Sequence, residues 1–136
     1  MNVSQIGRFA LVLLTGFGVF AGANLSWQQI TIGDICPMLG PVPACFVVLA
    51  GYALMLVSVF VVVRMRKLLF FAGWVPVMGL ASIGVVLELL QGDICPPGPA
   101  AIPQCFISLA MVVLCLLLFL KFVQTGQTRD KNDTQG

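Results

Sequence analysis

The chain has 136 residues, and its composition excludes a water-soluble globular domain. Hydrophobic residues make up 60% of it and charged residues 9%, with a mean hydropathy of +1.06 and a net charge of +2. A soluble domain carries about a quarter charged residues, so this chain cannot cover a surface that faces water. Lipid must therefore be the solvent for most of its length.

Apolar runs along the chain predict four membrane-spanning helices, over residues 9–27, 46–63, 68–90 and 106–120. A spanning helix needs roughly 17–25 mainly apolar residues, and the first three runs meet that length. The fourth is short, but Lys121 can reach the headgroups and so extend it. The first run is long for the core of a signal peptide, so we expect it to be retained.

Two similar segments follow the first and third runs. GDICPMLGPVPACF, residues 33–46, and GDICPPGPAAIPQCF, residues 92–106, share GDICP at the start and Pro-x-Cys-Phe at the end. Proline donates no backbone hydrogen bond and fixes φ, so the crowding of prolines in both segments predicts stiff loops. The sequence therefore predicts two loops rich in proline and cysteine.

The order of helix, GDICP loop and helix occurs twice, and this predicts an internal repeat. Aligning the two segments places Gln29 opposite Glu88. Each unit contains two helices, so both units enter the membrane in the same direction. The predicted fold is an all-α membrane domain over residues 1–123, a parallel tandem repeat of two helical hairpins, about 7–64 and 68–123. We expect the loops to approach one another around the pseudo-twofold axis.

The positive charges predict the orientation of the chain. Lys and Arg occur before the first run, between the second and third, and after the fourth, at Arg8, Arg64, Arg66, Lys67, Lys121, Arg129 and Lys131. By the positive-inside rule, both termini are cytoplasmic and both cysteine loops are extracytoplasmic, as in a bacterial inner-membrane protein. Residues 124–136 are polar and predict a disordered cytoplasmic tail.

Cysteines in an oxidising compartment are expected to form disulfides. Local pairing, Cys36 with Cys45 and Cys95 with Cys105, is the simplest of three connectivities. Structural clamps are favoured over a thiol–disulfide relay or metal capture. The paired cysteines have eight and nine intervening residues instead of two, the chain has no His, and no cation lies beside them to stabilise a thiolate. Cys115, in the middle of a helix, is expected to be unpaired. No metal or cofactor is expected.

Three acidic residues are candidates for a functional role. Asp34 and Asp93 precede Ile-Cys-Pro in the two loops, and Glu88 lies near the membrane edge. The favoured interpretation is that each Asp carboxylate caps its loop by accepting backbone N–H groups. The alternative is an acidic outer vestibule, including Glu88, that attracts cations or a basic partner.

Four helices with two outward cysteine pairs resemble the layout of the membrane disulfide-forming oxidoreductases that pass electrons to quinone, including the vitamin K epoxide reductase group. The resemblance implies thiol–disulfide exchange as one activity to consider. Those enzymes carry a Cys-x-x-Cys motif, which this sequence lacks. No catalytic residue is therefore assigned from the resemblance.

The predicted role is that of a non-enzymatic accessory or assembly protein. Its disulfide-stiffened cap would be presented to another membrane or extracytoplasmic protein, or to a second copy of the chain, and no nucleic acid is expected. One alternative is a membrane thiol–disulfide oxidoreductase that exchanges electrons with a quinone or a partner protein. The other is transport of a cation or small solute, for which the helices offer few polar groups: Thr15, Asn24, Ser58, Ser82, Glu88 and Ser108.

Overall fold

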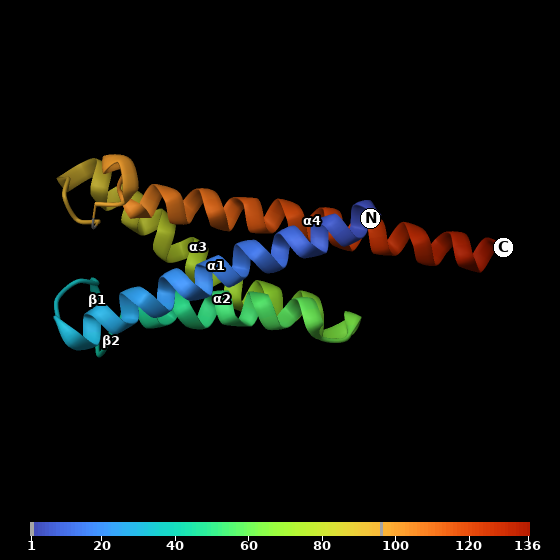
Figure 1. Ribbon diagram of the computed structural model, residues 1–136, viewed down its shortest axis with the longest axis horizontal. Helices are drawn as coiled ribbons and strands as arrows, with labels where there is room; N and C mark the ends of the chain where they lie inside the picture. Colours follow the sequence, from blue (N-terminus) through green and yellow to red (C-terminus); the bar gives the residue numbers. More distant parts are fainter. Residues whose placement is uncertain (1, 96) are drawn as a thin grey trace.

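The structure, a computed structural model, describes residues 2–95 and 97–136, without the side chains of residues 63, 99 and 126–130. Pro96 of the second loop and the Arg129 side chain lie outside the described residues. The chain is mostly helical. Its elements are α1 (Val3–Thr31), β1 (Met38–Leu39), β2 (Val42–Pro43), α2 (Ala44–Phe60), α3 (Val63–Gln91), the 3-10 helix η1 (Pro99–Ala101) and α4 (Gln104–Gln135), as Figure 1 shows.

The structure confirms a small helical membrane protein. Three segments are long and apolar enough to cross a membrane: Val3–Thr31, Arg64–Gln91 and Gln104–Thr125. The helix α2 has 17 residues, which gives it a length of about 25 Å, less than the ~30 Å of a bilayer core. It begins after Pro43 and ends where Val61 adopts an extended conformation. The second apolar run therefore forms the shortest of the four helices, although the fourth run was expected to be the shortest.

The polar residues at the C-terminus continue α4 as a helix to Gln135, where the sequence predicted a disordered tail. A helix that is already formed needs only propagation, which fixes one residue for each new hydrogen bond. The tail contains no proline to stop it. The last helix therefore projects well beyond the apolar bundle, at the right of Figure 1.

The helices pack in a ring in which α2 contacts α1 and α3, and α4 also contacts α1 and α3. Both disulfide loops lie at one end of the molecule and the chain termini lie toward the other (Figure 1). At the loop end, the α1–α2 pair and the α3–α4 pair diverge, so the two loops do not meet as expected. Each loop is therefore held in place by the two helices that it connects.

Small residues bring neighbouring helices close together. Gly18 packs against the ring of Tyr52, and a Cβ at Gly51 would lie 2.8 Å from the carbonyl oxygen of Gly73. Such close backbone approach is typical of helix packing in lipid. These contacts surround a core whose members come from all four helices: Leu11, Tyr52, Met55, Val59, Phe70, Val77, Val112, Cys115 and Phe119.

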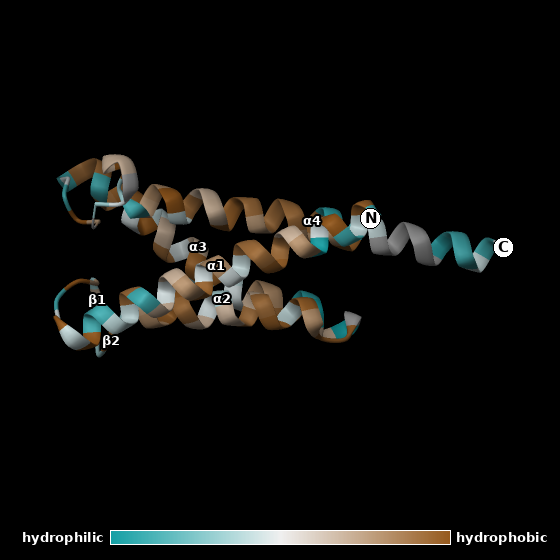
Figure 2. Ribbon diagram, viewed as in Figure 1, coloured by the Kyte–Doolittle hydropathy of each residue, from teal (hydrophilic) through white to brown (hydrophobic). Residues whose placement is uncertain are grey.

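The outer surface of the helices is apolar. Large hydrophobic side chains are exposed on all four of them, and Figure 2 shows hydrophobic residues along the helices, with hydrophilic ones toward the loops and the end of α4. Inside, the Phe70 and Phe119 rings stack with their centres 3.8 Å apart, and the Trp74 Nε1 donates a hydrogen bond to the Val112 carbonyl. The bundle thus presents a lipid-facing exterior around an aromatic centre.

Candidate functional site

The first loop begins with a sharp turn at the end of α1. The Ile32 N–H still donates to the Gln28 carbonyl at 2.8 Å. The next two residues, Gly33 and Asp34, adopt φ values of +76° and +52°. Gly has no penalty in this left-handed region, and Asp tolerates it better than most residues. The GD dipeptide thus turns the chain back over the end of the helix.

The side chain of Gln29 fixes the chain that returns. Its Oε1 accepts hydrogen bonds from the Ile35 N–H at 3.0 Å and from the Cys36 N–H at 2.8 Å. A single amide from the last turn of α1 therefore satisfies two backbone donors of the loop. This places Cys36 opposite Cys45 at the start of α2.

The disulfide Cys36–Cys45 closes the first loop, with its Cα atoms 6.1 Å apart, within the usual range for such bonds. Between the cysteines lies a small hairpin, in which Leu39 pairs with Val42 and Gly40 turns the chain at φ +67°. The hairpin is apolar and open to its surroundings: Met38 is 56%, Leu39 46% and Val42 42% exposed. The first loop is thus a rigid frame that displays hydrophobic side chains.

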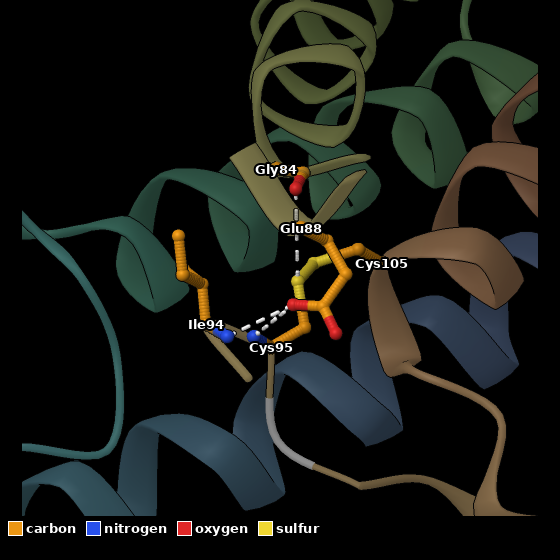
Figure 3. Close-up of a disulfide and its surroundings, with 5 residues drawn as sticks. All are labelled: Gly84, Glu88, Ile94, Cys95 and Cys105. Atoms are coloured by element: carbon orange, nitrogen blue, oxygen red, sulfur yellow. Dashed lines mark hydrogen bonds between the residues drawn. A yellow bond between two sulfur atoms is a disulfide. The ribbon is translucent and has the colours of Figure 1, made fainter. Parts of the chain in front are cut away.

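The second loop has the same frame. Gly92 and Asp93 adopt φ values of +67° and +54°. The Glu88 Oε2 accepts hydrogen bonds at 2.9 Å from both the Ile94 and Cys95 N–H groups, as Figure 3 shows. Glu88 stands at the same distance before GDICP as Gln29, so a carboxylate here does what an amide does in the first loop.

A disulfide also closes the second loop. Cys95 and Cys105 are joined with their Cα atoms 6.0 Å apart. Both predicted pairings are therefore present, and Cys115 is free and buried. Gly84 of α3 makes room for the sulfur atoms, because a Cβ at Gly84 would lie 3.0 Å from the Cys105 Sγ. The Cys95 Sγ lies 3.9 Å from the Gly84 carbonyl oxygen. This is a packing contact, since a sulfur in a disulfide has no proton to donate.

The interior of the second loop differs from that of the first. Its chain forms the short helix η1, and Ala100 and Ala101 adopt φ values of +63° and +59°. The Gly98 N–H donates to the Ile102 carbonyl at 3.0 Å. A non-glycine residue in the left-handed region costs roughly 1–2 kcal/mol. The one additional residue of this loop is thus accommodated in a strained turn.

A shallow pocket of about 200 Å³ lies inside the second loop. It is lined by Glu88, Asp93, Cys95, Pro97, Ala101 and Pro103. The Glu88 Oε1, the oxygen that does not hold the loop, points away from the Ile94 and Cys95 N–H groups in Figure 3. Two acidic residues, Glu88 and Asp93, therefore line the same pocket as Cys95 of the disulfide.

The two Asp carboxylates are not the capping groups that the sequence predicted. Both residues are exposed, and their contribution to the loop is the left-handed backbone. Gln29 and Glu88 accept the loop N–H groups instead. Gln29 was not predicted as a site residue, although its alignment with Glu88 was a usable signal. Asp34 and Asp93 also lie on loops that are separated in Figure 1, so they do not form one acidic pair.

This arrangement limits the reactions in which the cysteines can take part. All four loop cysteines are consumed in disulfides. Among the described residues, no group of three or more His, Cys, Asp or Glu side chains is placed to hold a metal ion. Cys36 and Cys45 are 8% and 7% exposed, so an attacking thiolate has little access to the first pair. The second pair is less buried and borders the pocket.

The polar groups inside the bundle mostly bond to their own helices. The Thr15 hydroxyl donates to the Leu11 carbonyl at 2.7 Å, and the Ser58 hydroxyl donates to the Met55 carbonyl at 2.6 Å. Both side chains are fully buried. Within the described part of the chain, the Ser26 hydroxyl is the one buried side-chain oxygen without a hydrogen-bond partner. These groups offer little support for a polar path along the bundle.

Comparisons with protein-family models, with curated proteins and with solved structures give no match for this chain.

Proposed function

We propose that this protein is an accessory or assembly subunit that presents a disulfide-stiffened cap to a membrane or extracytoplasmic protein partner. In this proposal α2 also spans the bilayer, so that four helices form a parallel tandem repeat of two hairpins. Both termini are cytoplasmic and both loops are extracytoplasmic, in a bacterial inner membrane.

The observation that carries the proposal is the frame shared by the two loops. Each has a left-handed Gly-Asp turn, a side-chain oxygen that accepts two N–H groups, and a disulfide. A shared frame at the same distance from each helix end also supports the tandem repeat. A loop held this firmly loses little conformational entropy when it binds, and pre-organisation of that kind raises affinity.

The exposed hairpin of the first loop gives the cap a surface suited to a protein partner. Met38, Leu39 and Val42 project from a segment without charged residues. Apolar side chains held on a rigid turn outside the hydrocarbon core favour contact with another protein over contact with water. The second loop adds an acidic pocket beside Ile102, which is 48% exposed. The cap therefore offers one apolar and one acidic surface.

Purification from the native membrane in a mild detergent tests the partner. We expect a stable, stoichiometric protein to co-purify with the chain. The Met38→Ser/Leu39→Ser variant should lose it while retaining both disulfides in non-reducing peptide maps. Ile102→Ser is the matched variant for the second loop and shows which loop makes the contact. Isolation of the chain without a partner but with a bound quinone would favour the oxidoreductase alternative.

Reporter fusions test the orientation separately. A reporter that works only in the cytoplasm should be active when fused after Lys131 and inactive when inserted at Leu39, because the C-terminal part of α4 and the strand β1 lie at opposite ends of the molecule (Figure 1). Activity at Leu39 would place the loops in the cytoplasm, which is not an oxidising compartment.

A further inference from the structure

The end of the bundle opposite the loops carries a cluster of positive charges. The cluster consists of Arg8 on α1 and Arg64, Arg66 and Lys67 in the first turn and a half of α3. Three of the five acidic residues in the chain, Asp34, Glu88 and Asp93, belong to the loop end, and the others follow Arg129 in the tail. Among the described side chains, no carboxylate forms an ion pair with the cluster.

Two arginines of this cluster are held in place by aromatic rings from the other two helices. The Arg8 guanidinium carbon lies 5.8 Å from the ring centre of Phe60 on α2, and that of Arg66 lies 5.0 Å from the ring centre of Phe122 on α4. The Arg66 Nη2 also bonds to the carbonyl of Val61, the residue that follows Phe60, so both guanidinium groups lie at the C-terminal end of α2. All four helices thus contribute to bringing two like charges together, an arrangement that an anion would stabilise.

The donors of Arg66 are not all used within the protein. Its Nη2 makes a long hydrogen bond of 3.4 Å to the Val61 carbonyl, while its Nε is buried and has no partner. A buried donor without a partner costs free energy. The N-terminus of α3 has no side-chain cap and no acidic residue in its first turn, so its helix dipole adds to the positive potential.

Exposed apolar side chains alternate with these basic residues. Val62 is 76%, Met65 49% and Leu68 64% exposed. The segment that is apolar enough to span a membrane begins at Arg64. A ligand at this position would therefore meet guanidinium groups and hydrocarbon side chains within one turn of helix. That combination fits a lipid, whose phosphate and acyl chains lie next to one another.

We infer that Arg8 and Arg66 form the centre of a binding site for the phosphate of an anionic phospholipid, in the leaflet at the basic end of the bundle. Arginine is suited to this ligand because its planar N–H groups can bind two phosphate oxygens at once. Arg64 and Lys67 strengthen the local field, and Val62 and Leu68 contact the acyl chains. The site lies at the far end from the loops and is independent of their function.

Native mass spectrometry of the full chain in a mild detergent tests the site. Phosphatidylglycerol should be retained at least about tenfold better than phosphatidylcholine. Each of Arg8→Gln and Arg66→Gln should weaken that retention about fivefold, since one basic residue near a membrane surface contributes about 1 kcal/mol. Lys131→Gln is the matched control, because it removes the same charge from the exposed end of α4, and it should change retention less than twofold.

Three results would overturn the inference. They are equal retention of the two lipids, equal effects of Arg66→Gln and Lys131→Gln, and displacement of phosphatidylglycerol by millimolar inorganic phosphate, which would indicate a site for a soluble anion. If Arg66→Gln does not fold, Arg8→Gln still decides the matter, because Arg8 is exposed. Arg66→Lys provides a further variant that keeps the charge and loses the planar donor group.

Discussion

The two disulfide loops share a frame and differ in what the frame encloses. In the first loop a neutral amide holds the chain, the disulfide is buried, and a regular hairpin displays Met38 and Leu39. In the second loop a carboxylate holds the chain and the disulfide is less buried. A strained turn with two left-handed alanines borders an acidic pocket. The shared features are those that a GDICP loop needs in order to fold. The features that differ are the surfaces that each loop presents.

Among the changes that compare the two loops, loss of a disulfide is expected to lower the stability of the protein most. In the chain-entropy account, a loop of this length is stabilised by about 2–3 kcal/mol, somewhat less where prolines already stiffen it. Cys36→Ser/Cys45→Ser should cost about 3 kcal/mol, because it also buries two hydroxyls, and Cys95→Ser/Cys105→Ser about 2 kcal/mol. Unfolding in sodium dodecyl sulfate, followed by tryptophan fluorescence, measures both. A larger loss for the second pair would reverse the proposed ranking.

Removal of the oxygen that holds each loop is expected to rank second. Glu88→Leu and Gln29→Leu each leave two backbone donors without a partner. We expect a loss of about 2 kcal/mol for Glu88→Leu and somewhat less for Gln29→Leu, since hydrogen bonds to charged acceptors are stronger. The matched exchanges Glu88→Gln and Gln29→Glu keep an oxygen at the same position and should cost less than about 1 kcal/mol. If Glu88→Gln were as damaging as Glu88→Leu, the carboxylate charge itself would be required.

The two disulfides are expected to differ in their accessibility to a reductant. The free-energy difference is smaller than the losses of stability given above. With a membrane-impermeant phosphine as reductant, Cys95–Cys105 should be reduced about tenfold faster than Cys36–Cys45, equivalent to about 1.4 kcal/mol in the barrier. Thiol labelling and peptide mapping of sealed vesicles give both rates. Neither pair is expected to equilibrate in redox buffers between about −180 and −270 mV, the range of working thiol–disulfide proteins. Equilibration of Cys95–Cys105 in that range would favour the oxidoreductase alternative for the second loop.

The backbone of the two turns is expected to give the smallest effect. Gly40 and Ala101 both adopt a left-handed conformation. Ala101→Gly relieves steric strain but makes the unfolded chain more flexible, so it should stabilise the protein by less than about 1 kcal/mol. Gly40→Ala introduces the same strain into the first loop, where no neighbour obstructs a Cβ, and should destabilise by about 1 kcal/mol. A destabilising Ala101→Gly would mean that the methyl group of Ala101 makes a contact that outweighs the strain.

The sequence predicted the features that depend on composition and spacing. Long apolar runs specified helices for a membrane, and two short, proline-rich segments brought each cysteine close to its neighbour. The role of Asp34 was missed because its backbone conformation is not visible in residue type alone. The role of Gln29 was missed because its side chain acts on residues six and seven positions later, after the chain has turned back.

Other features depend on packing that a single sequence leaves open. The two helix pairs diverge at the loop end, while α2 and α3 approach closely at Gly51 and Gly73. Small residues in α1 and α3 would permit several such contacts, and the sequence does not specify which one forms. The length of α2 is likewise set by the loop and turn that bound it, at Pro43 and Val61.

The buried thiol of Cys115 is a built-in probe for opening of the helix bundle. Cys115 is fully buried in the centre of the bundle and is the free cysteine among the described residues. An alkylating reagent can therefore reach it only during a transient separation of the helices. When such openings are rapid compared with alkylation, the labelling rate reports the free energy of opening under native conditions. Labelling at this one sulfur atom therefore measures what fraction of the time the helices are separated in the lipid.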